Sequence, residues 1–410
     1  MSGAANVEAG CPLEGVLVAD FSRVLAGPLA TMTLADLGAR VVKVERPGGG
    51  DETRAWGPPF SEHGSTYYES VNRGKQSLVL DLRDPADLAA ARELALRADV
   101  VVENFKAGTM ERLGLGYEAV AADNPGVVYC SITGFGTTGG KDLLGYDFVV
   151  QAVGGLMSIT GQPDGEPTKV GVALVDVLTG KDAVIGILAA LTARERTGRG
   201  DRLEVSLLSS LLGGLVNQGQ ACLETGRPGR RMGNQHPSIA PYETLRCRDG
   251  MIAVASGNDG QFARLAEVLD DPDLASDRRF ASNAARVAHR DALVELLEAR
   301  LREQDGDHWV ARLNAAQVPA GRVNTIPEAL ALAERLGLEP TVDVGDGWTP
   351  QVRHPVAYTA YRTAQPSPPP ALGADSTELR TWLGRAPNPH PVQSLRRPTT
   401  QRTSETAPQP

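Results

Sequence analysis

The residue of greatest chemical interest is Asp176, which follows the apolar run 171–175 and precedes a segment with a helical pattern. A carboxylate there would meet backbone N–H groups and the positive end of a helix dipole, and both keep it ionised. An ionised, partly desolvated carboxylate can attack an activated acyl carbon and form a mixed anhydride. An N-capping aspartate has the same local pattern, and spacing alone favours that structural interpretation.

A second candidate is a glycine-rich segment that follows a predicted strand, Gly134-Phe135-Gly136-Thr137-Thr138-Gly139. This G-x-G-x-x-G pattern could hold a pyrophosphate on backbone N–H groups at the start of a helix. However, residues 140–147 make a poor start for a helix, and no second strand ends in an acidic residue about 20 positions further on. The pattern therefore predicts a tight structural turn, which could still face a ligand.

Other familiar catalytic patterns are absent from the sequence. It has no G-x-S-x-G, H-E-x-x-H or G-x-x-x-x-G-K-[ST] motif, and its 6 histidines are scattered. The 4 cysteines are too widely spaced to predict structural zinc or a disulfide framework, so we expect free thiols in a reducing cytosol. Covalent chemistry would need another nucleophile, and a carboxylate is the leading option.

Composition excludes several classes of partner. The 410 residues carry 41 Lys and Arg against 50 Asp and Glu, a net charge of −9, which argues against nucleic acid and anionic membrane surfaces as partners. The longest apolar run, 183–191, is about half the length that a membrane span needs. No secretory signal is visible over residues 1–12. We therefore expect a cytoplasmic protein.

The first 200 residues alternate short apolar runs with amphipathic stretches, which predicts parallel strands joined by right-handed helical crossovers. One such stretch, Pro85–Ala98, begins after Asp84, a plausible N-cap. This pattern is typical of an α/β, Rossmann-like parallel sheet. The predicted strands are Val16–Ala19, Val41–Val44, Ser77–Leu80, Val100–Val102 and Val127–Ile132.

The second half is organised differently. Lys181–Arg196 has the apolar spacing of a buried helix, and the Asp249-Gly250 dipeptide between two strand-like runs predicts a β-hairpin. Length suggests two or three domains. The expected divisions are a large domain over 1–205, a linker helix over 206–226, a small α+β domain over 227–325, a linker and return to the large domain over 326–385, and a disordered tail over 386–410.

Several blocks together resemble CoA-transferase family III, the group that includes formyl-CoA transferase and carnitine CoA-transferase. The similarity runs from about Leu13 to about Leu383. The blocks are Leu25–Pro28, Leu37–Pro47, Val102–Phe105, Ser131–Gly136 and the segment around Asp176. Within the family the chain looks closest to enzymes that move CoA between succinyl-CoA and other dicarboxylates such as glutarate, on the segments Trp56–Phe60, Ser65–Tyr68 and Ser238–Tyr242.

The resemblance implies that Asp176 is the nucleophile and forms an aspartyl anhydride and then an aspartyl-CoA thioester. It implies CoA or acyl-CoA as a substrate, no metal and no permanently bound cofactor. It also implies that the large domain is completed by the C-terminal segment and that two chains form an interlocked homodimer. The positions that match CoA-binding residues of the family are Leu25, Ala26, Arg46, Leu80, Arg83, Asn104, Phe105, Lys106, Arg112, Gly134, Phe135 and Gly136.

Departures from the family narrow the expected substrate. Formyl-CoA transferases have a Gln where this chain has Leu25, and their run of glycines in the small domain is not found, which argues against formate or oxalate. The related α-methylacyl-CoA racemases have a Gly-His-Asp segment where this chain has Tyr146, a poor base for α-proton exchange. His236 could pair with the distal carboxylate of an acceptor acid. A racemase and a non-catalytic CoA-ester-binding protein stay open as alternatives.

Overall fold

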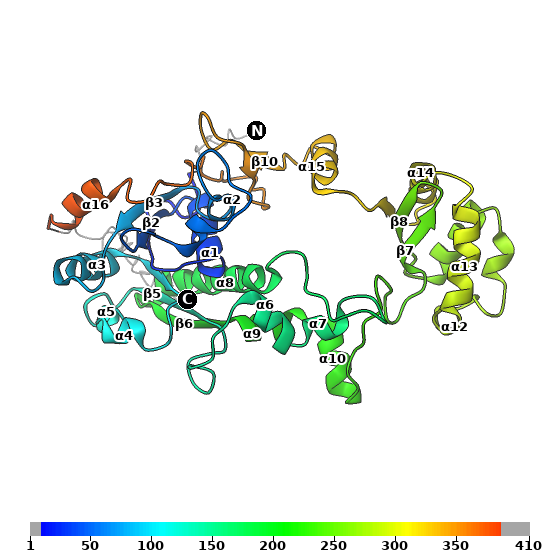
Figure 1. The fold of residues 1–410 in the computed structure, drawn as a ribbon, viewed down its shortest axis with the longest axis horizontal. Coiled ribbons are helices and arrows are strands. Elements are labelled where there is room, and N and C mark those ends of the chain that lie inside the picture. The colour runs from blue at the N-terminus through cyan, green and yellow to red at the C-terminus, as the bar shows by residue number, and fades with distance from the viewer. Residues whose placement is uncertain (1–9, 387–410) are drawn as a thin grey trace, which may run out of the picture. The chain divides into compact units, whose positions relative to one another are not determined.

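The computed structural model describes residues 10–386, which divide into two compact units (Figure 1). Residues 10–144, 176–207 and 343–386 form the first unit, and residues 145–175 and 208–342 form the second. The start of the chain and, from residue 387 onward, the predicted tail lie outside the described residues. The finer domain boundaries expected from the sequence stay predictions.

The first unit is built on a six-stranded parallel sheet with the order β3-β2-β1-β4-β5-β6. This is the order of a Rossmann sheet, so the predicted fold class is confirmed. The order reverses between β1 and β4, and ligands of such sheets bind in the crevice outside the carboxyl ends of the strands. The strands are β1 (Leu17–Asp20), β2 (Arg40–Glu45), β3 (Lys75–Val79), β4 (Val100–Glu103), β5 (Val128–Thr133) and β6 (Asp201–Ser206).

The sequence predicts the first five of these strands but not β6. The four inner strands are hydrogen-bonded on both sides, so their residues form nearly continuous apolar runs. By contrast, β6 is an edge strand that pairs with β5 alone, from Val128↔Asp201 to Thr133↔Ser206. It mixes charged residues with apolar ones and has no fully buried member, so an apolar run could not reveal it.

Helices cover the sheet and bring distant segments to it. The predicted helix after Asp84 is confirmed as α3, with the Asp84 carboxylate accepting from the backbone N–H groups of residues 86 and 87. A core that includes Val42, Leu94 and Val101 lies between sheet and helices. The helices of this unit are α1 (Ala26–Asp36), α2 (Thr66–Glu69), α3 (Pro85–Arg97), α4 (Thr109–Arg112), α5 (Tyr117–Asp123), α8 (Leu174–Thr197, from its third residue onward), α16 (Ser376–Leu383) and the short 3-10 helix η1 (Glu52–Ala55).

The C-terminal segment completes the large unit, as the resemblance implies. The carboxylate of Asp375 accepts a hydrogen bond from the backbone N–H of Ser77 at 2.8 Å. The hydroxyl of Ser376 accepts one from Val79 at 3.0 Å. Both acceptors bind the free edge of β3, and α16 packs its apolar side chains Leu379 and Leu383 into the core of the unit.

The second unit has its own core under a three-stranded antiparallel sheet of β7 (Tyr242–Cys247), β8 (Gly250–Ala255) and β9 (Ala320–Arg322). The predicted hairpin is confirmed, but Cys247 pairs with Gly250, so its turn residues are Arg248 and Asp249 rather than Asp249 and Gly250. The helices are α6 (Asp147–Val153), α7 (Leu156–Ile159), α9 (Leu207–Gly214, from its second residue), α10 (Val216–Thr225), α11 (Asp259–Val268), η2 (Pro272–Ala275), α12 (Asn283–Ala288), α13 (Arg290–Leu301), α14 (Gly306–Ala315) and α15 (Ile326–Arg335). The two-residue strand β10 (Thr341–Val342) ends this unit, and the two-residue strand β11 (Gln351–Val352) belongs to the first unit.

Candidate active site

Asp176 lies inside the first turn of α8 rather than at its N-cap, because the helix already begins at Leu174. The N-cap interpretation is therefore wrong. The two apolar residues directly before Asp176, Leu174 and Val175, already belong to the helix. From the sequence alone, an apolar run followed by an acidic residue can be either the end of a strand or the start of a helix. Only 8% of the residue is exposed, so the carboxylate is largely desolvated at the positive end of a helix of 24 residues.

Gly180 brings this turn of α8 against the start of α1. It follows Asp176 by one helical turn, so the two residues lie on the same face of α8. A Cβ atom at Gly180 would lie only 2.8 Å from the carbonyl oxygen of Ala26. Glycine therefore permits an approach that other residues would prevent. The face of α8 that carries Asp176 thus packs against Ala26, which is one of the predicted CoA-contacting residues together with Leu25.

A cavity of about 500 Å³ lies at the carboxyl ends of β1, β2 and β3. It brings together four predicted CoA-binding residues, Arg46, Leu80, Arg83 and Phe105, and adds Arg23, which the sequence reasoning missed. The guanidinium of Arg23 lies 5.1 Å from the centre of the Phe105 ring. Apolar walls with cationic side chains suit a nucleotide, because the base can pack on the former and phosphates can bind the latter.

A second cavity of about 400 Å³ lies beside the carboxyl ends of β4 and β5. Phe105 lines this cavity as well, and Lys106 lines it together with Lys141 and Arg202. The ammonium of Lys106 pairs with Asp142 at 3.3 Å, and both side chains are exposed. A phosphate that reached this cavity would therefore meet further cationic groups, although acidic side chains also line it.

The remaining predicted CoA-binding residues line neither of these two cavities. The side-chain amide of Asn104 binds the backbone of Arg23 in both directions, donating to its carbonyl at 2.7 Å and accepting from its N–H at 2.9 Å. Arg112, in α4, donates to the Thr109 hydroxyl at 3.0 Å. Gly136 has a φ of 84°, which favours glycine, and no helix follows before α6. The segment Gly134-Phe135-Gly136 is thus a turn rather than a dinucleotide loop.

Sequence reasoning also missed the buried carboxyl group of Glu103, at the carboxyl end of β4. One oxygen of this group accepts from the backbone N–H of Phe105 at 2.8 Å. Burial raises the pKa of Glu103 to about 7, although hydrogen bonds from Ser131 and from Phe105 oppose the rise. An acidic residue at the end of the apolar run 100–102 was the available signal.

Further charged residues are buried in the first unit, among them Asp20, Lys43, Asp51 and Lys75. Burial alone would raise the pKa of Asp20, but the ammonium groups of Lys75 and Lys43 lower it to about 2. A lysine inside the apolar run Val41-Val42-Lys43-Val44 was the sequence signal, because an unpaired charge would be costly there.

The two predicted acceptor-binding residues belong to the second unit. Tyr146 precedes α6 and is 55% exposed. The backbone N–H of His236 donates to the carbonyl of Tyr242 at 3.0 Å, and its ring lies 5.1 Å from that tyrosine ring. The Nδ1 atom of His236 accepts from the backbone N–H of Ser238 at 3.1 Å. Their role toward an acceptor acid stays a prediction.

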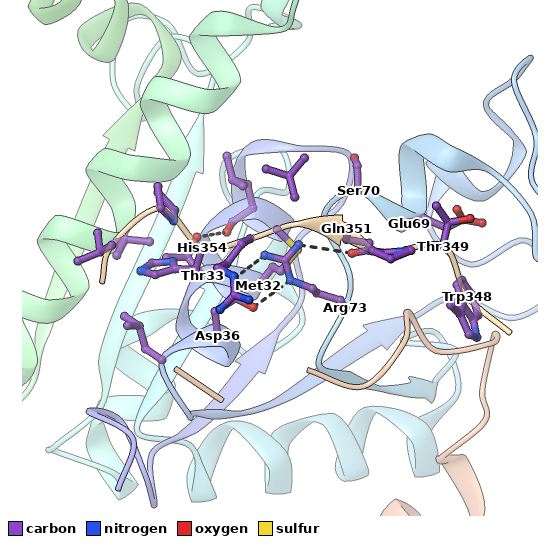
Figure 2. A pocket seen from close by; sticks show the side chains of 18 of the residues that line it. Met32, Thr33, Asp36, Glu69, Ser70, Arg73, Trp348, Thr349, Gln351 and His354 are labelled. Atoms are coloured by element: carbon purple, nitrogen blue, oxygen red, sulfur yellow. Dashed lines mark hydrogen bonds and ion pairs between the residues drawn. The ribbon is translucent and has the colours of Figure 1, made fainter. Parts of the chain in front are cut away.

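A larger cavity, of about 1040 Å³, contains none of the predicted site residues. It lies among α1, α8 and the segment 348–358, and Figure 2 shows the buried ion pair in its wall, between Arg73 and Asp36. The guanidinium donates to both carboxylate oxygens, at 2.7 and 3.0 Å.

Among residues 10–386, no group of three or more His, Cys, Asp or Glu side chains is arranged to hold a metal ion. In that same range no helix is long and apolar enough to cross a membrane.

The chain has known relatives over most of its length. The chain is 43% identical over 382 residues to a succinate–glutarate CoA-transferase of Agrobacterium fabrum, covering 91% of this chain and 96% of the relative. It is 40% identical over 380 residues to a succinyl-CoA:glutarate CoA-transferase of Homo sapiens, covering 90% and 85%. A CAIB/BAIF family protein from Brucella suis has a solved structure that superposes with a TM-score of 0.83 at 43% identity, covering 91% of this chain and all of that one.

The sequence profile of CoA-transferase family III matches residues 13–376, a range that includes all six strands of the parallel sheet, Asp176 and the residues that line the two cavities at the strand ends. The resemblance seen in the sequence is thereby confirmed. This chain is a CoA-transferase that belongs to family III.

Proposed function

We propose that the protein moves CoA from succinyl-CoA to a dicarboxylic acid, such as glutarate, through covalent intermediates on Asp176. One observation carries the proposal: Asp176 is a largely buried carboxylate in the first turn of α8, on the helix face that packs against Ala26. The named activities of the relatives from Agrobacterium fabrum and Homo sapiens support succinate and glutarate as the acids.

The exchange consists of four attacks on acyl carbons. The Asp176 carboxylate attacks the thioester carbonyl, the C–S bond breaks, and CoA leaves as thiolate from the succinyl–Asp176 anhydride. The thiolate then attacks the Asp176 carbonyl carbon and releases succinate, which leaves an aspartyl-CoA thioester. The acceptor carboxylate displaces CoA to form a second anhydride. Finally, the thiolate attacks the acceptor's acyl carbon, which frees the new acyl-CoA and the Asp176 carboxylate.

Each attack develops an oxyanion that needs hydrogen-bond donors. The first N–H groups of a helix have no acceptor within the helix, and in α1 these are the amides of Ala26 and Gly27. The next residue is Pro28, which has no N–H to offer. We assign the amides of Ala26 and Gly27 to oxyanion stabilisation, since α1 begins against the helix face that carries Asp176.

CoA binding is assigned to the carboxyl ends of the strands. In the 500 Å³ cavity, Leu80 and Phe105 would pack against the adenine, and Arg46 and Arg83 would bind phosphates. Lys106 and Arg112 would extend this cationic region, and Leu25 with the turn 134–136 would line the pantetheine path. Arg83 is 89% exposed and pairs with Asp81, so a phosphate would have to compete with that carboxylate.

We further propose a cytoplasmic homodimer. The helix α15 and the residues after it expose Ile326, Leu336 and Leu338, and a second copy of the chain could bury these side chains. Cys11, Cys130, Cys222 and Cys247 are free, which suits a compartment that keeps thiols reduced. Light scattering after size-exclusion chromatography would test the oligomeric state, with twice the chain mass as the expected result.

The transfer itself is tested with the full chain, succinyl-CoA and a mixture of short mono- and dicarboxylic acids. Mass spectrometry should find new thioesters of dicarboxylic acids with the wild-type protein and none with Asp176→Ala. Release of free CoA alone would show hydrolysis and would contradict transfer. Exchange of an α-proton on a branched acyl-CoA, without any acceptor acid, would instead indicate a racemase.

A further inference from the structure

In the loop between β1 and α1, residues 21–25, the backbone N–H of Phe21 donates to the backbone carbonyl of Val102 at 2.8 Å, whereas side chains hold the next three residues. The backbone N–H of Ser22 donates to the Asp20 carboxylate at 2.9 Å. The carbonyl of Ser22 accepts from the ammonium of Lys43 at 2.8 Å. Both backbone groups of the next residue, Arg23, bind the Asn104 amide at 2.7 and 2.9 Å. Three separate segments of the chain therefore fix two consecutive residues of this loop.

The fourth residue of the loop, Val24, has the left-handed backbone conformation, with a φ of 70°. A β-branched residue rarely adopts this conformation and keeps it only where its surroundings impose it. Its N–H faces the Asp51 carboxylate, with 3.2 and 3.3 Å to the two oxygens. Asp51 in turn pairs with the ammonium of Lys43 at 2.9 Å, and neither side chain is exposed. The Lys43–Asp51 pair therefore clamps the loop at Ser22 and at Val24.

A buried ion pair contributes little net stability, because desolvation offsets most of its attraction, and apolar residues in its place are often as stable. Its effect on conformation is more specific here. Burial alone would raise the pKa of Asp51, but the ammonium of Lys43 holds it below its usual range, so the pair stays ionised. Each charge then has one backbone partner in the loop and holds it in place.

The clamped loop leads directly into the residues nearest the proposed chemistry. Val24 is followed by Leu25 and then by Ala26, where α1 begins and where α8 packs through Gly180. A change of backbone conformation at Val24 would reorient the first amides of α1 relative to the face of α8 that carries Asp176. Misplacement of reacting groups by about 1 Å can lower a rate by about 100-fold.

We propose that Lys43 and Asp51, supported by Asn104, are positioning residues that preorganise the start of α1 for acyl transfer at Asp176. This inference rests on the proposed function. Lys43 and Asp51 form part of the wall of the 500 Å³ cavity. Their side chains are fully buried and are already bound to each other and to the loop. We therefore expect this pair to act mainly on the turnover number and little on CoA affinity.

The test is the double variant Lys43→Met/Asp51→Asn, in which the pair is neutral while the amide oxygen can still accept from Val24. We expect a kcat for succinyl-CoA:glutarate exchange about 100-fold below wild type, with a Kd for CoA within about 3-fold, a small change on the affinity scale. The matched control is Arg73→Met/Asp36→Asn, which neutralises another buried pair, at the other end of α1 (Figure 2). Its kcat should stay within about 2-fold of wild type, since that pair does not touch the loop.

The proposal would be overturned if Lys43→Met/Asp51→Asn kept the wild-type kcat, whatever its unfolding temperature. Should the double variant not fold, Asn104→Ala removes only the clamp on Arg23, from a half-buried position. Because Asn104 is also a predicted CoA-binding residue, the readout for this variant is the kcat at saturating succinyl-CoA. A loss of kcat at saturation would support positioning, and a wild-type kcat at saturation would contradict it. Exchange by the wild-type protein in the same assay separates failure of this proposal from failure of the proposed function.

Discussion

Glu103 links the ionisation of a single buried group to the segment that is expected to bind CoA. Its pKa is about 7 in the folded chain and near 4.5 when the chain is unfolded. The folded state therefore binds the proton more tightly between these two values. The stability that this provides is fully present below pH 4.5 and is lost as the pH rises to 7. The carboxyl group also holds the backbone of Phe105, a residue that lines both cavities.

Replacing Glu103 with Gln should remove this pH dependence. Between pH 5 and 7 the free energy of unfolding of the wild-type protein should fall, relative to Glu103→Gln, by roughly 2 kcal/mol, because one pH unit corresponds to about 1.4 kcal/mol per proton. Urea denaturation at the two pH values measures the difference. Glu118→Gln, on the exposed surface of α5, is the control and should follow the wild type. An equal change in the free energy of unfolding between pH 5 and 7 for wild type and Glu103→Gln would contradict the raised pKa of Glu103.

Single residues also mark what could be predicted from the sequence. Asp176 was identifiable because its segment matches the family, and its spacing alone favoured an N-cap. Lys43 was visible as a charge within an apolar strand, but its partner Asp51 comes from a loop that only the tertiary fold brings to it. The position of Arg23 was likewise not predictable. Arg23 follows β1 and Phe105 follows β4, and only the pairing of these two strands brings both residues to the 500 Å³ cavity.

At the scale of elements, the packing of α8 on α1 determines where Asp176 lies. Gly180 allows this packing, whereas Gly186, six residues further along the same helix, does not contact α1. A Cβ atom at Gly186 would have its nearest neighbour at 3.4 Å, the flexible end of the Leu203 side chain. The two glycines therefore form a matched pair that separates helix propensity from close packing.

Gly180→Ala should move α8 away from α1, because the new methyl group meets a backbone carbonyl at 2.8 Å. We expect a loss of stability of about 1–3 kcal/mol, typical of overpacking, and a lower rate of CoA transfer. Gly186→Ala should instead gain about 0.5–1 kcal/mol, since alanine is the better helix former. Thermal unfolding and transfer rates of the two variants measure this contrast. Equal behaviour would show that the contact with Ala26 does not position Asp176.

The elements themselves were predictable where burial gave a simple pattern. The inner strands appear as short apolar runs, and Asp84-Pro85 marks the start of α3. The predicted linker helix over residues 206–226 is instead two helices, α9 and α10, because the chain breaks at Leu215, next to Val216, which has a φ of 40°. The Gly213-Gly214 pair that ends α9 was the available sequence signal, since glycine weakens a helix interior.

For the whole molecule, net charge alone is a poor guide to the ligand. The chain carries −9, yet its proposed substrate is an anion. In the first unit, Arg23, Arg46 and Arg83 line one cavity and make it locally cationic despite the negative net charge. Local cations decide binding because charges separated by more than about 10 Å are screened at 0.1 M salt. The acidic composition still argues against nucleic acid, which needs a continuous basic surface.

CoA affinity should therefore weaken with salt in spite of the negative net charge. From 50 to 500 mM NaCl we expect the Kd for CoA to rise several-fold, as the exposed arginines are screened. Arg46→Ala should raise the Kd about 10-fold at low salt, the loss of one charge-assisted contact, and should flatten the salt dependence. Isothermal titration calorimetry measures both. Arg278→Ala, exposed in the second unit, is the control. If Arg46→Ala left the salt dependence of the Kd for CoA unchanged, Arg46 would not belong to the CoA site.

The central claim, that the acyl group and then CoA are carried by Asp176, is tested most directly by trapping the intermediate. The protein is incubated with succinyl-CoA, treated with hydroxylamine and digested, and the peptide that contains residue 176 is sequenced by mass spectrometry. We predict an aspartyl hydroxamate at Asp176 that depends on succinyl-CoA and is absent from Asp176→Ala, which should also transfer no CoA. An unmodified Asp176 during active transfer, or transfer by Asp176→Ala, would contradict the account.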